Sequence, residues 1–385
     1  MKDDTKFVTE GRKADDDMKI VNPKVYHAST VLLPNAQALK SHDLKYNYGR
    51  RGSPASYAFK KALAEFEGGY DAVLTSSGLS AVTTALLAFV TAGDHVLMTD
   101  SCYGPARNVC NTLLKRFGVD TTFYDPTIGA DIEALFQDNT RVVFCESPGS
   151  QTFEVQDIPA IANVAHAKGA LVIVDNTWAS PYFMKPFALG ADVALQSITK
   201  YIGGHSDVLM GVISTTEQHW PRLFQMNNLL GNSVGPDDFY LAQRGFRTLG
   251  VRMRQHQENA LKVAKWLESR PEVDRILYPA LESHPQHHIW KRDFSGASGT
   301  FGVILKSPPG AHVDAMLDGY EFFGIGYSFG GYESLAITVD PSANRTVTSW
   351  DTSKAGLRFH VGLEDPEDLI KDLEAGFERL ASTTP

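Results

Sequence analysis

The sequence has few cysteines, no long apolar run and no excess of basic residues, and each absence excludes a class of protein. Cys102, Cys110 and Cys145 form no C-x-x-C spacing, so a disulfide framework and a thiolate metal or redox motif are not indicated, and a reducing compartment is expected. The apolar run 85–90 is far too short to span a membrane. The first twenty residues mix five basic with six acidic residues, unlike a signal peptide. We therefore expect a cytoplasmic protein with no membrane segment.

The charge balance and the motifs that are missing narrow the function further. Across 385 residues, 36 Lys and Arg stand against 45 Asp and Glu, a formal charge of −9. A general nucleic-acid binder needs basic surface to displace counterions from phosphates, so no nucleic-acid partner is expected. There is no P-loop or dinucleotide-binding fingerprint. His284, His287 and His288 lack a completing carboxylate or cysteine cluster, so no metal is predicted.

Short apolar runs alternate with helical stretches through the middle of the chain. This alternation is typical of an α/β fold with a mostly parallel sheet covered on both faces. Strands are expected at 71–75, 95–98, 121–124, 141–145, 170–175, 191–195 and 211–214, and helices at 79–90, 105–117 and 158–167. The run 170–175 is interpreted as a central strand, whose end is where open α/β sheets hold ligands.

Changes in composition and apolar pattern along the sequence divide the chain into three parts. Residues 1–54 are predicted to be a mobile tail, as far as about Lys19, followed by an extended arm that contacts a neighbouring subunit or forms a surface loop. Residues 55–245 form the large α/β domain and residues 246–385 a smaller α+β domain. A long helix is expected at 236–267, across the boundary between the two domains. Within the smaller domain we expect strands at 301–306, 321–327, 334–339 and 356–361, and a final helix from 366.

A lysine beside two hydroxyl residues is the most informative local feature. Lys200 follows an apolar run, with Ser197 and Thr199 just before it and a glycine pair just after it. A lysine amine can attach to the aldehyde of pyridoxal phosphate, and hydroxyls at these positions can donate to its phosphate. A solvated loop lysine is the other interpretation of this short motif.

Four further segments complete a candidate cofactor site. Asp175 closes the central strand, where an acid can keep a pyridine ring protonated, although it could also be a turn aspartate. Gly78 and Leu79 begin a predicted helix, whose free N–H groups favour an anion, although an ordinary strand-to-helix turn fits equally well. Tyr103 could stack on a flat ring or serve packing. Arg358 could bind a carboxylate in bidentate fashion or form a surface salt bridge.

Together these segments resemble the cysteine/methionine-metabolism family of pyridoxal phosphate enzymes from about Ile20 to the C-terminus. The matching pieces are Tyr48-Gly-Arg50-Arg51-Gly52, Ser77-Gly78-Leu79-Ser80, Tyr103-Gly104-Pro105, the segments 175–181 and 197–201, Ser328-Phe-Gly-Gly-Tyr-Glu-Ser334, and Leu357-Arg358-Phe-His360. The resemblance implies the fold type I architecture of these enzymes and a homotetramer built from two active-site dimers. Tyr332 resembles the β-eliminating branch, so the implied activity is that of a carbon–sulfur lyase that converts L-cystathionine to homocysteine, pyruvate and ammonia.

The resemblance also implies a role for each matched residue. The residues expected to bind the cofactor are Lys200, which holds it, Asp175 at the ring nitrogen, Tyr103 stacked on the ring, and Gly78, Leu79, Ser197 and Thr199 at the phosphate. Tyr48 and Arg50 are expected to reach the neighbouring subunit's site, with Tyr48 also near the substrate. Arg358 and the Ser328 backbone are expected to hold the substrate's carboxylate, and Lys200 and Tyr103 to act in catalysis.

One departure and three alternatives remain at this point. Phe329 stands where the best-known β-lyases carry tryptophan, which leaves the preferred sulfur amino acid open. A γ-lyase or γ-synthase on the same scaffold is the nearest alternative, and a cysteine desulfhydrase is another. A non-catalytic protein that binds an amino acid or pyridoxal phosphate is the third, and the set Lys200, Asp175 and Arg358 argues against it.

Overall fold

The apolar runs of the sequence form a seven-stranded sheet. The computed structural model describes residues 1–12, 20–41 and 44–383, and its strand order is β1-β7-β6-β5-β4-β2-β3. The strands are β1 (Asp71–Thr75), β2 (His95–Thr99), β3 (Asp120–Tyr124), β4 (Thr140–Glu146), β5 (Leu171–Asp175), β6 (Val193–Ser197) and β7 (Gly211–Thr215). All neighbouring pairs are parallel except the two that β7 makes, with β1 and with β6. The mostly parallel sheet and the central position of β5 are confirmed.

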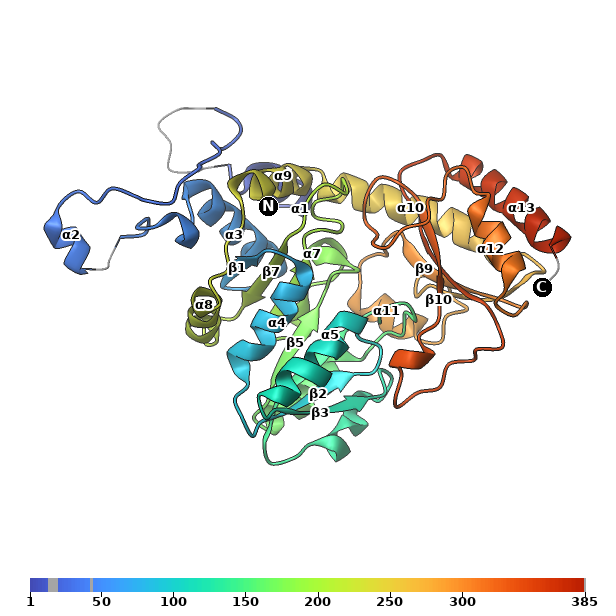
Figure 1. Cartoon of the computed structure of the whole chain (residues 1–385), viewed down its shortest axis with the longest axis horizontal. Coiled ribbons are helices and arrows are strands. Elements are labelled where there is room, and N and C mark those ends of the chain that lie inside the picture. The colour runs from blue at the N-terminus through green and yellow to red at the C-terminus, as the bar shows by residue number, and fades with distance from the viewer. Residues whose placement is uncertain (13–19, 42–43, 384–385) are drawn as a thin grey trace.

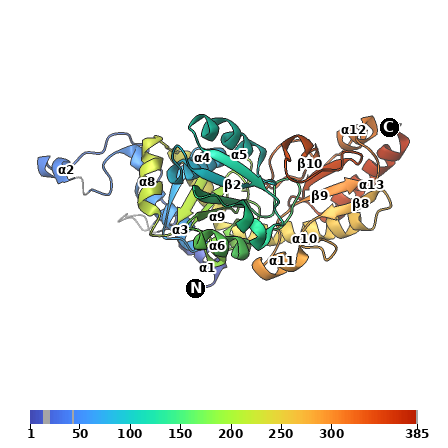
Figure 2. The ribbon, with the colours of Figure 1, turned by 90° about the horizontal axis from the view of Figure 1, so that it is seen from below.

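Helices cover both faces of this sheet. The helices α4 (Gly78–Phe89) and α5 (Gly104–Asn108) lie on one side, whereas α6 (Ile158–Ala167) lies on the other (Figure 2). Helix α3 (Pro54–Glu67) packs in the same apolar cluster as α6. Successive residues of β2 therefore enter different cores, with Leu97 on the α6 side and Met98 on the α4 side, both fully buried. A strand buried on both faces gives the continuous apolar runs seen in the sequence.

The smaller sheet is antiparallel and lies at the C-terminal end of the molecule (Figure 1). Its order is β10-β11-β9-β8, from β8 (Val273–Leu277), β9 (Thr300–Leu305), β10 (Leu335–Val339) and β11 (Gly356–His360). The associated helices are α10 (Leu249–Glu268), α11 (His287–Asp293), α12 (Ala311–Asp318) and α13 (Pro366–Ser382). The sequence analysis did not anticipate β8 or α12. The domain boundaries at 54/55 and 245/246 remain a proposal.

Two predicted elements of the C-terminal part are wrong. The long helix expected at 236–267 is two helices, α9 (Pro236–Arg247) and α10, because Thr248 between them has φ −108° and ψ 7°, outside helical values. The strand expected at 321–327 is a loop, in which the N–H groups of Glu321, Phe322 and Phe323 donate to the Asp372 carboxylate. A side chain thus replaces the neighbouring strand as their hydrogen-bond partner.

The N-terminal region combines a packed helix with a projecting arm. Helix α1 (Asp3–Thr9) buries Phe7 against Phe66 and Phe246, so the prediction of a mobile tail is wrong there, while residues 13–19 lie outside the described chain. The arm runs from Ile20 through α2 (Ala36–Ser41), which projects away from the body (Figure 1). The remaining helices near the large sheet are α7 (Ser180–Phe183) and α8 (Trp220–Leu229). Among the described residues, we find no helix with the length and apolar character needed to cross a membrane.

Candidate active site

One cavity collects most of the predicted site residues. Its volume is about 660 Å³, within the range of small-molecule sites, and it lies where the ends of the parallel strands face the smaller sheet. The predicted residues that line it are Gly78, Leu79, Tyr103, Asp175, Ser197, Thr199, Lys200, Ser328, Phe329 and Arg358. This placement agrees with the rule that open α/β sheets bind ligands at the carboxyl ends of their strands.

Lys200 lies in the turn that follows β6, with its amine directed at the smaller sheet. Its Nζ donates to Ser328 Oγ at 2.5 Å and lies 4.9 Å from the centre of the Phe329 ring. Burial lowers the pKa of Lys200 to about 8, helped by the positive charge of Arg358 and opposed by Asp175. The lowered pKa makes the neutral amine, the form that a nucleophile or base needs, far more accessible near neutral pH than in an ordinary lysine.

Asp175 lies at the end of β5, where almost none of its surface is exposed. Its Oδ1 accepts two hydrogen bonds from Thr177, from the backbone N–H at 2.9 Å and the hydroxyl at 2.5 Å. Burial raises the pKa of Asp175 to about 6, and the Thr177 bonds and the Lys200 charge oppose that rise. Within the described residues Oδ2 accepts no hydrogen bond, which suits a carboxylate that pairs with a protonated ring nitrogen.

Glu146 is a site residue that the sequence analysis missed. It ends β4 and pairs in register with Asp175, and its Oε2 accepts the backbone N–H of Tyr103 at 2.7 Å. Burial, and then the neighbouring Asp175 charge, raise the pKa of Glu146 well above its usual range. The bond fixes the backbone of Tyr103, a residue that is 45% exposed and lines the cavity. The sequence offered a signal for Glu146, since it directly follows the apolar run 141–145 as Asp175 ends the run 170–175.

The opposite end of the cavity suits a phosphate. Ser77 caps α4, leaving the first N–H groups of that helix, those of Gly78 and Leu79, beside Ser197 and Thr199. A Cβ atom on Gly78 would lie 2.7 Å from both Cβ and Oγ of Ser197, so only glycine lets the helix start approach the Lys200 turn this closely. The free N–H groups and the helix dipole favour an anion here.

Arg358, on β11, brings a positive charge from the smaller sheet. Its Nη2 donates to the Ser328 carbonyl at 2.8 Å, while its buried Nε finds no acceptor among the described residues. Burial lowers the pKa of Arg358 to about 10, which leaves it charged at neutral pH. A half-buried guanidinium whose Nε is buried and unused fits a carboxylate ligand.

The loop that contains Ser328 and Gly330 contacts both Lys200 and Arg358. Ser328 has φ +94°, a value that non-glycine residues rarely adopt, and it presents its hydroxyl to Lys200 and its carbonyl to Arg358. A Cβ atom on Gly330 would lie 2.7 Å from the backbone nitrogen of Tyr201, so glycine permits the loop to approach the Lys200 turn. The loop thus sets the relative positions of Lys200 and Arg358.

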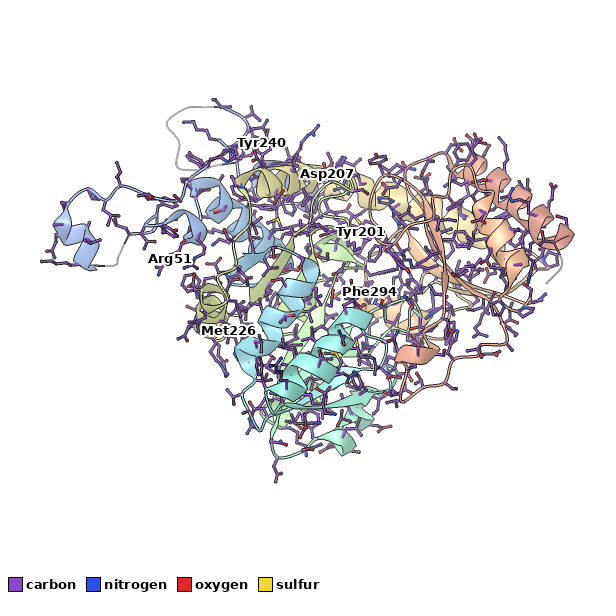
Figure 3. All side chains as sticks on the ribbon, in the orientation of Figure 1. Arg51, Tyr201, Asp207, Met226, Tyr240 and Phe294 are labelled. Atoms are coloured by element: carbon purple, nitrogen blue, oxygen red, sulfur yellow. The ribbon has the colours of Figure 1, made fainter. Side chains whose placement is uncertain are left out.

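Tyr48 and Arg50 lie away from this cavity. Both belong to the arm, and Arg50 lines a separate cavity of about 340 Å³, where its Nη1 donates to the Asn228 carbonyl at 3.3 Å. Figure 3 shows Arg51, the next residue, well apart from Tyr201, which follows Lys200. Within one chain the structure therefore does not bring these two arm residues to the Lys200 site.

The residues that line the large cavity fit pyridoxal phosphate. Lys200 would attach the aldehyde, Asp175 would pair with the ring nitrogen and the start of α4 would receive the phosphate. The fit rests on the unused Nε of Arg358, the free Oδ2 of Asp175 among the described residues, and the glycine-shaped space at Gly78.

Comparisons with known proteins agree with this fit. The chain is 41% identical over 389 residues to cystathionine beta-lyase MetC of Escherichia coli, covering 98% of each chain, and 42% identical to the cystathionine beta-lyase of Salmonella typhimurium, again covering 98% of each. It is also 41% identical to the L-alanine/L-glutamate racemase of Wolbachia pipientis, covering 99% and 98%. The crystal structure of cystathionine gamma synthase from Xanthomonas oryzae, in complex with aminoacrylate and cysteine, superposes with a TM-score of 0.91 at 32% identity over the whole of both chains.

A family model establishes the membership. The model described as Cys/Met metabolism PLP-dependent enzyme matches residues 4–378, so the relationship begins earlier than the predicted Ile20 and includes α1. The predicted fold type and cofactor, pyridoxal phosphate, are confirmed, and the predicted lyase class agrees with two of these relatives. The chain belongs to the family of Cys/Met metabolism PLP-dependent enzymes.

Proposed function

We propose that this enzyme is a carbon–sulfur lyase that carries out β-elimination on L-cystathionine. With one water consumed, the products are homocysteine, pyruvate and ammonia. The observation that carries the proposal is the arrangement of Lys200, Asp175 and Arg358 around one cavity, with the amine pKa lowered to about 8. The likeness to two curated β-lyases supports the choice of bond that is broken.

The chain's own residues supply binding and proton transfer. Arg358 holds the substrate's α-carboxylate, which directs the Cα–H bond toward Lys200. When bound, pyridoxal phosphate draws electrons from Cα and so makes that proton acidic. Lys200 in its neutral form takes the proton, and Ser328 Oγ, at 2.5 Å from Nζ, steers the amine between positions. Asp175 stabilises positive charge at the ring nitrogen, and Tyr103 covers the ring.

Phe329 and Tyr327 influence the preference for the part of the substrate beyond sulfur. Phe329 packs against Tyr201, with ring centres 5.7 Å apart, and lies beside both Lys200 and Arg358. It provides an apolar surface without the N–H of an indole. Tyr327 is 91% exposed and lines the same cavity. We therefore place the sulfur substituent of the substrate against these rings.

A substrate panel tests the proposed reaction. Cystathionine, cystine, cysteine and methionine are incubated with the holoenzyme and the keto acids are identified. We expect pyruvate from cystathionine, with homocysteine in equal amount. Release of 2-oxobutyrate from cystathionine or methionine would instead identify a γ-lyase. Pyruvate and sulfide from cysteine, with little turnover of cystathionine, would identify a desulfhydrase.

A racemase is a second candidate, favoured by the likeness to the Wolbachia protein. Racemisation needs the same proton removal from Cα, followed by return of a proton to the other face. L-alanine and L-glutamate, which have no leaving group at Cβ, are therefore added to the panel, and the products are separated by chirality. D-amino acid formation faster than pyruvate release from cystathionine would overturn the lyase proposal.

The assembly and location complete the proposal. We propose that Tyr48 and Arg50 of the arm reach the phosphate site of a neighbouring subunit in a cytoplasmic homotetramer. The exposed arm residues Leu32 and Leu39 and the distance of Arg50 from its own Lys200 cavity support a partner. Mass measurement in solution tests the tetramer, and mixing Arg50→Ala chains with Lys200→Ala chains tests the sharing of sites. Restored activity in the mixture is expected, because one of its sites receives both intact residues.

A further inference from the structure

A third carboxylate lies at the same edge of the large sheet as Asp175 and Glu146. Asp100 directly follows β2, is 2% exposed and borders the Lys200 cavity. It contributes to no step of the proposed reaction. Most of its partners come from the connection between β10 and β11, more than two hundred residues later in the chain.

The Asp100 carboxylate gathers an unusually large set of donors. Three consecutive backbone N–H groups, of Thr346, Val347 and Thr348, donate to it at 3.0–3.1 Å. The hydroxyls of Thr346 and Thr348 donate at 3.1 Å each, and Arg107 Nη2 donates at 2.5 Å. The carboxylate thus fastens a loop of the smaller domain to a strand end of the larger one.

The charge of Asp100 matches this role. Burial alone would raise its pKa, but the backbone bonds from residues 346–348 and the Arg107 bond outweigh burial and lower the pKa to about 2. Asp100 is therefore ionised throughout the physiological range, and the loop is held by a permanent charge.

The fastened loop forms one wall of the cavity. Asn344 and Arg345 immediately precede the anchored residues and line the cavity. Arg345 also donates to Thr152 Oγ1 at 2.8 Å and to Glu154 Oε1 at 2.7 Å, which ties the wall to the segment after β4. The hydrogen bonds that link Lys200, Ser328 and Arg358 involve no residue of this wall.

We propose that Asp100 is a positioning residue for the part of the substrate beyond sulfur, a role that rests on the proposed function. By fixing Asn344 and Arg345, it shapes the space for a long substituent on the Cβ atom. Long thioether or disulfide diamino acids contact this wall, whereas cysteine, which ends at sulfur, does not. Loss of the anchor therefore discriminates between long and short substrates of the same chemistry.

The test compares Asp100→Asn with Asp351→Asn in the holoenzyme. Asp351 lies in the same β10–β11 connection but is exposed and only caps a turn at Ser353, so it is a matched control. Steady-state constants are measured for cystathionine and cysteine, or for the longest and shortest substrates that the panel identifies. Limited proteolysis of residues 340–354 and the cofactor's visible absorbance are recorded alongside.

For Asp100→Asn we expect KM for the long substrate to rise about tenfold, the lower end of the effect of one pocket contact. The constants for the short substrate and the absorbance should stay within about twofold of the parent, and cleavage within 340–354 should accelerate. The control should match the parent throughout. If Asp100→Asn fails to fold, Thr348→Val removes one anchoring hydroxyl and should shift KM in the same direction by less.

Equal loss for both substrates, or no change in either, would overturn the proposal. Failure of the proposed function gives a different result, because the unmodified enzyme would then release no pyruvate from cystathionine while the proteolysis comparison still reports on the anchor. Faster cleavage together with unchanged selectivity would identify Asp100 as merely structural and would refute the role in substrate positioning.

Discussion

Two aspartates end strands of the same sheet and have opposite properties. Asp175 at the end of β5 has a pKa raised to about 6, mainly by burial, whereas Asp100 beyond the end of β2 has a pKa lowered to about 2. Both are nearly inaccessible to solvent. The difference lies in the donors. Within the described part of the chain only Thr177 donates to Asp175, whereas three backbone N–H groups, two threonine hydroxyls and Arg107 donate to Asp100.

The donors suit the role proposed for each carboxylate, ligand binding for Asp175 and the joining of two segments of the fold for Asp100. A buried carboxylate with few donors is unstable by itself and gains most from a positively charged ring. A carboxylate whose acceptor sites are filled gains nothing from a ligand and instead orders the chain that supplies the donors. Location at a strand end is common to both, so the donor count distinguishes the two roles.

Among the substitutions considered, the largest effect on activity is expected at Lys200. Lys200→Ala should lower kcat by about 10²- to 10⁴-fold, the contribution of a positioned base, and should abolish the visible absorbance of the bound cofactor. Its unfolding midpoint should change little, because Lys200 makes one side-chain hydrogen bond among the described residues. Turnover and absorbance spectra check this directly.

Lys61→Ala is the matched control, since Lys61 is exposed on α3. It should retain full turnover and full absorbance. A Lys200→Ala protein with both properties intact would mean that the chemistry lies elsewhere in the molecule.

Replacing each of the two aspartates by asparagine should change the free energy of unfolding in opposite directions. In cofactor-free protein at pH 7, Asp100→Asn should lose about 3–5 kcal/mol of stability, because Arg107 is left buried without its charge partner. Asp175→Asn should gain on the order of 1–3 kcal/mol, because an ionised and poorly solvated carboxylate is removed. Chemical denaturation of the three proteins measures both differences.

The changes in unfolding free energy caused by Asp175→Asn and Asp100→Asn should depend on pH in different ranges. Because the pKa of Asp175 is raised in the folded state, the parent loses stability as pH rises from about 4 to about 6. The extra stability of Asp175→Asn over the parent should therefore vanish below about pH 4. The lowered pKa of Asp100 means that its contribution is complete above about pH 4 and is lost toward pH 2, so the deficit should narrow only there. Equal signs for the two variants at pH 7 would contradict the account.

Arg358 gives the third and smaller effect. Arg358→Leu should raise KM for the amino acid about 10- to 150-fold, the worth of one charged hydrogen bond, and leave the cofactor's absorbance in place. Arg275→Leu, at an exposed arginine of β8 in the same sheet, should behave as the parent. A change in kcat alone, with KM unaltered, would assign Arg358 to another task.

Local patterns predicted the part of the site that the large sheet carries. Each predicted apolar run ends within two residues of the end of its strand, so Asp175, Lys200 and Gly78 could be placed at one edge from the sequence. Ser328 was assigned to the site only through the family resemblance, and the residues alone left Arg358 open between a carboxylate ligand and a surface salt bridge. Their part of the chain has alternating patterns and loops that resemble surface structure. The strand expected at 321–327 fails for the same reason, since Asp372, some fifty residues away in sequence, satisfies its backbone.

Contacts between distant segments explain what the sequence left hidden. The anchor at Asp100 joins residues separated by more than two hundred positions, and no local spacing announces it. Glu146 was detectable in principle, but its bond to Tyr103 depends on the pairing of β4 with β2, the strand that precedes Tyr103. Phe7 is the one aromatic residue of the strongly charged segment 1–12, and it is buried against rings of α3, α7 and α9, those of Phe66, Tyr182 and Phe246.

Trapping the bound cofactor with borohydride is the most direct test of the central claim. The reduced protein is digested and the peptide that carries the added phosphopyridoxyl mass is sequenced. The account predicts a single modified residue, Lys200, in the peptide that follows β6. Modification at another lysine, such as the buried Lys60 beside the arm cavity, would contradict it.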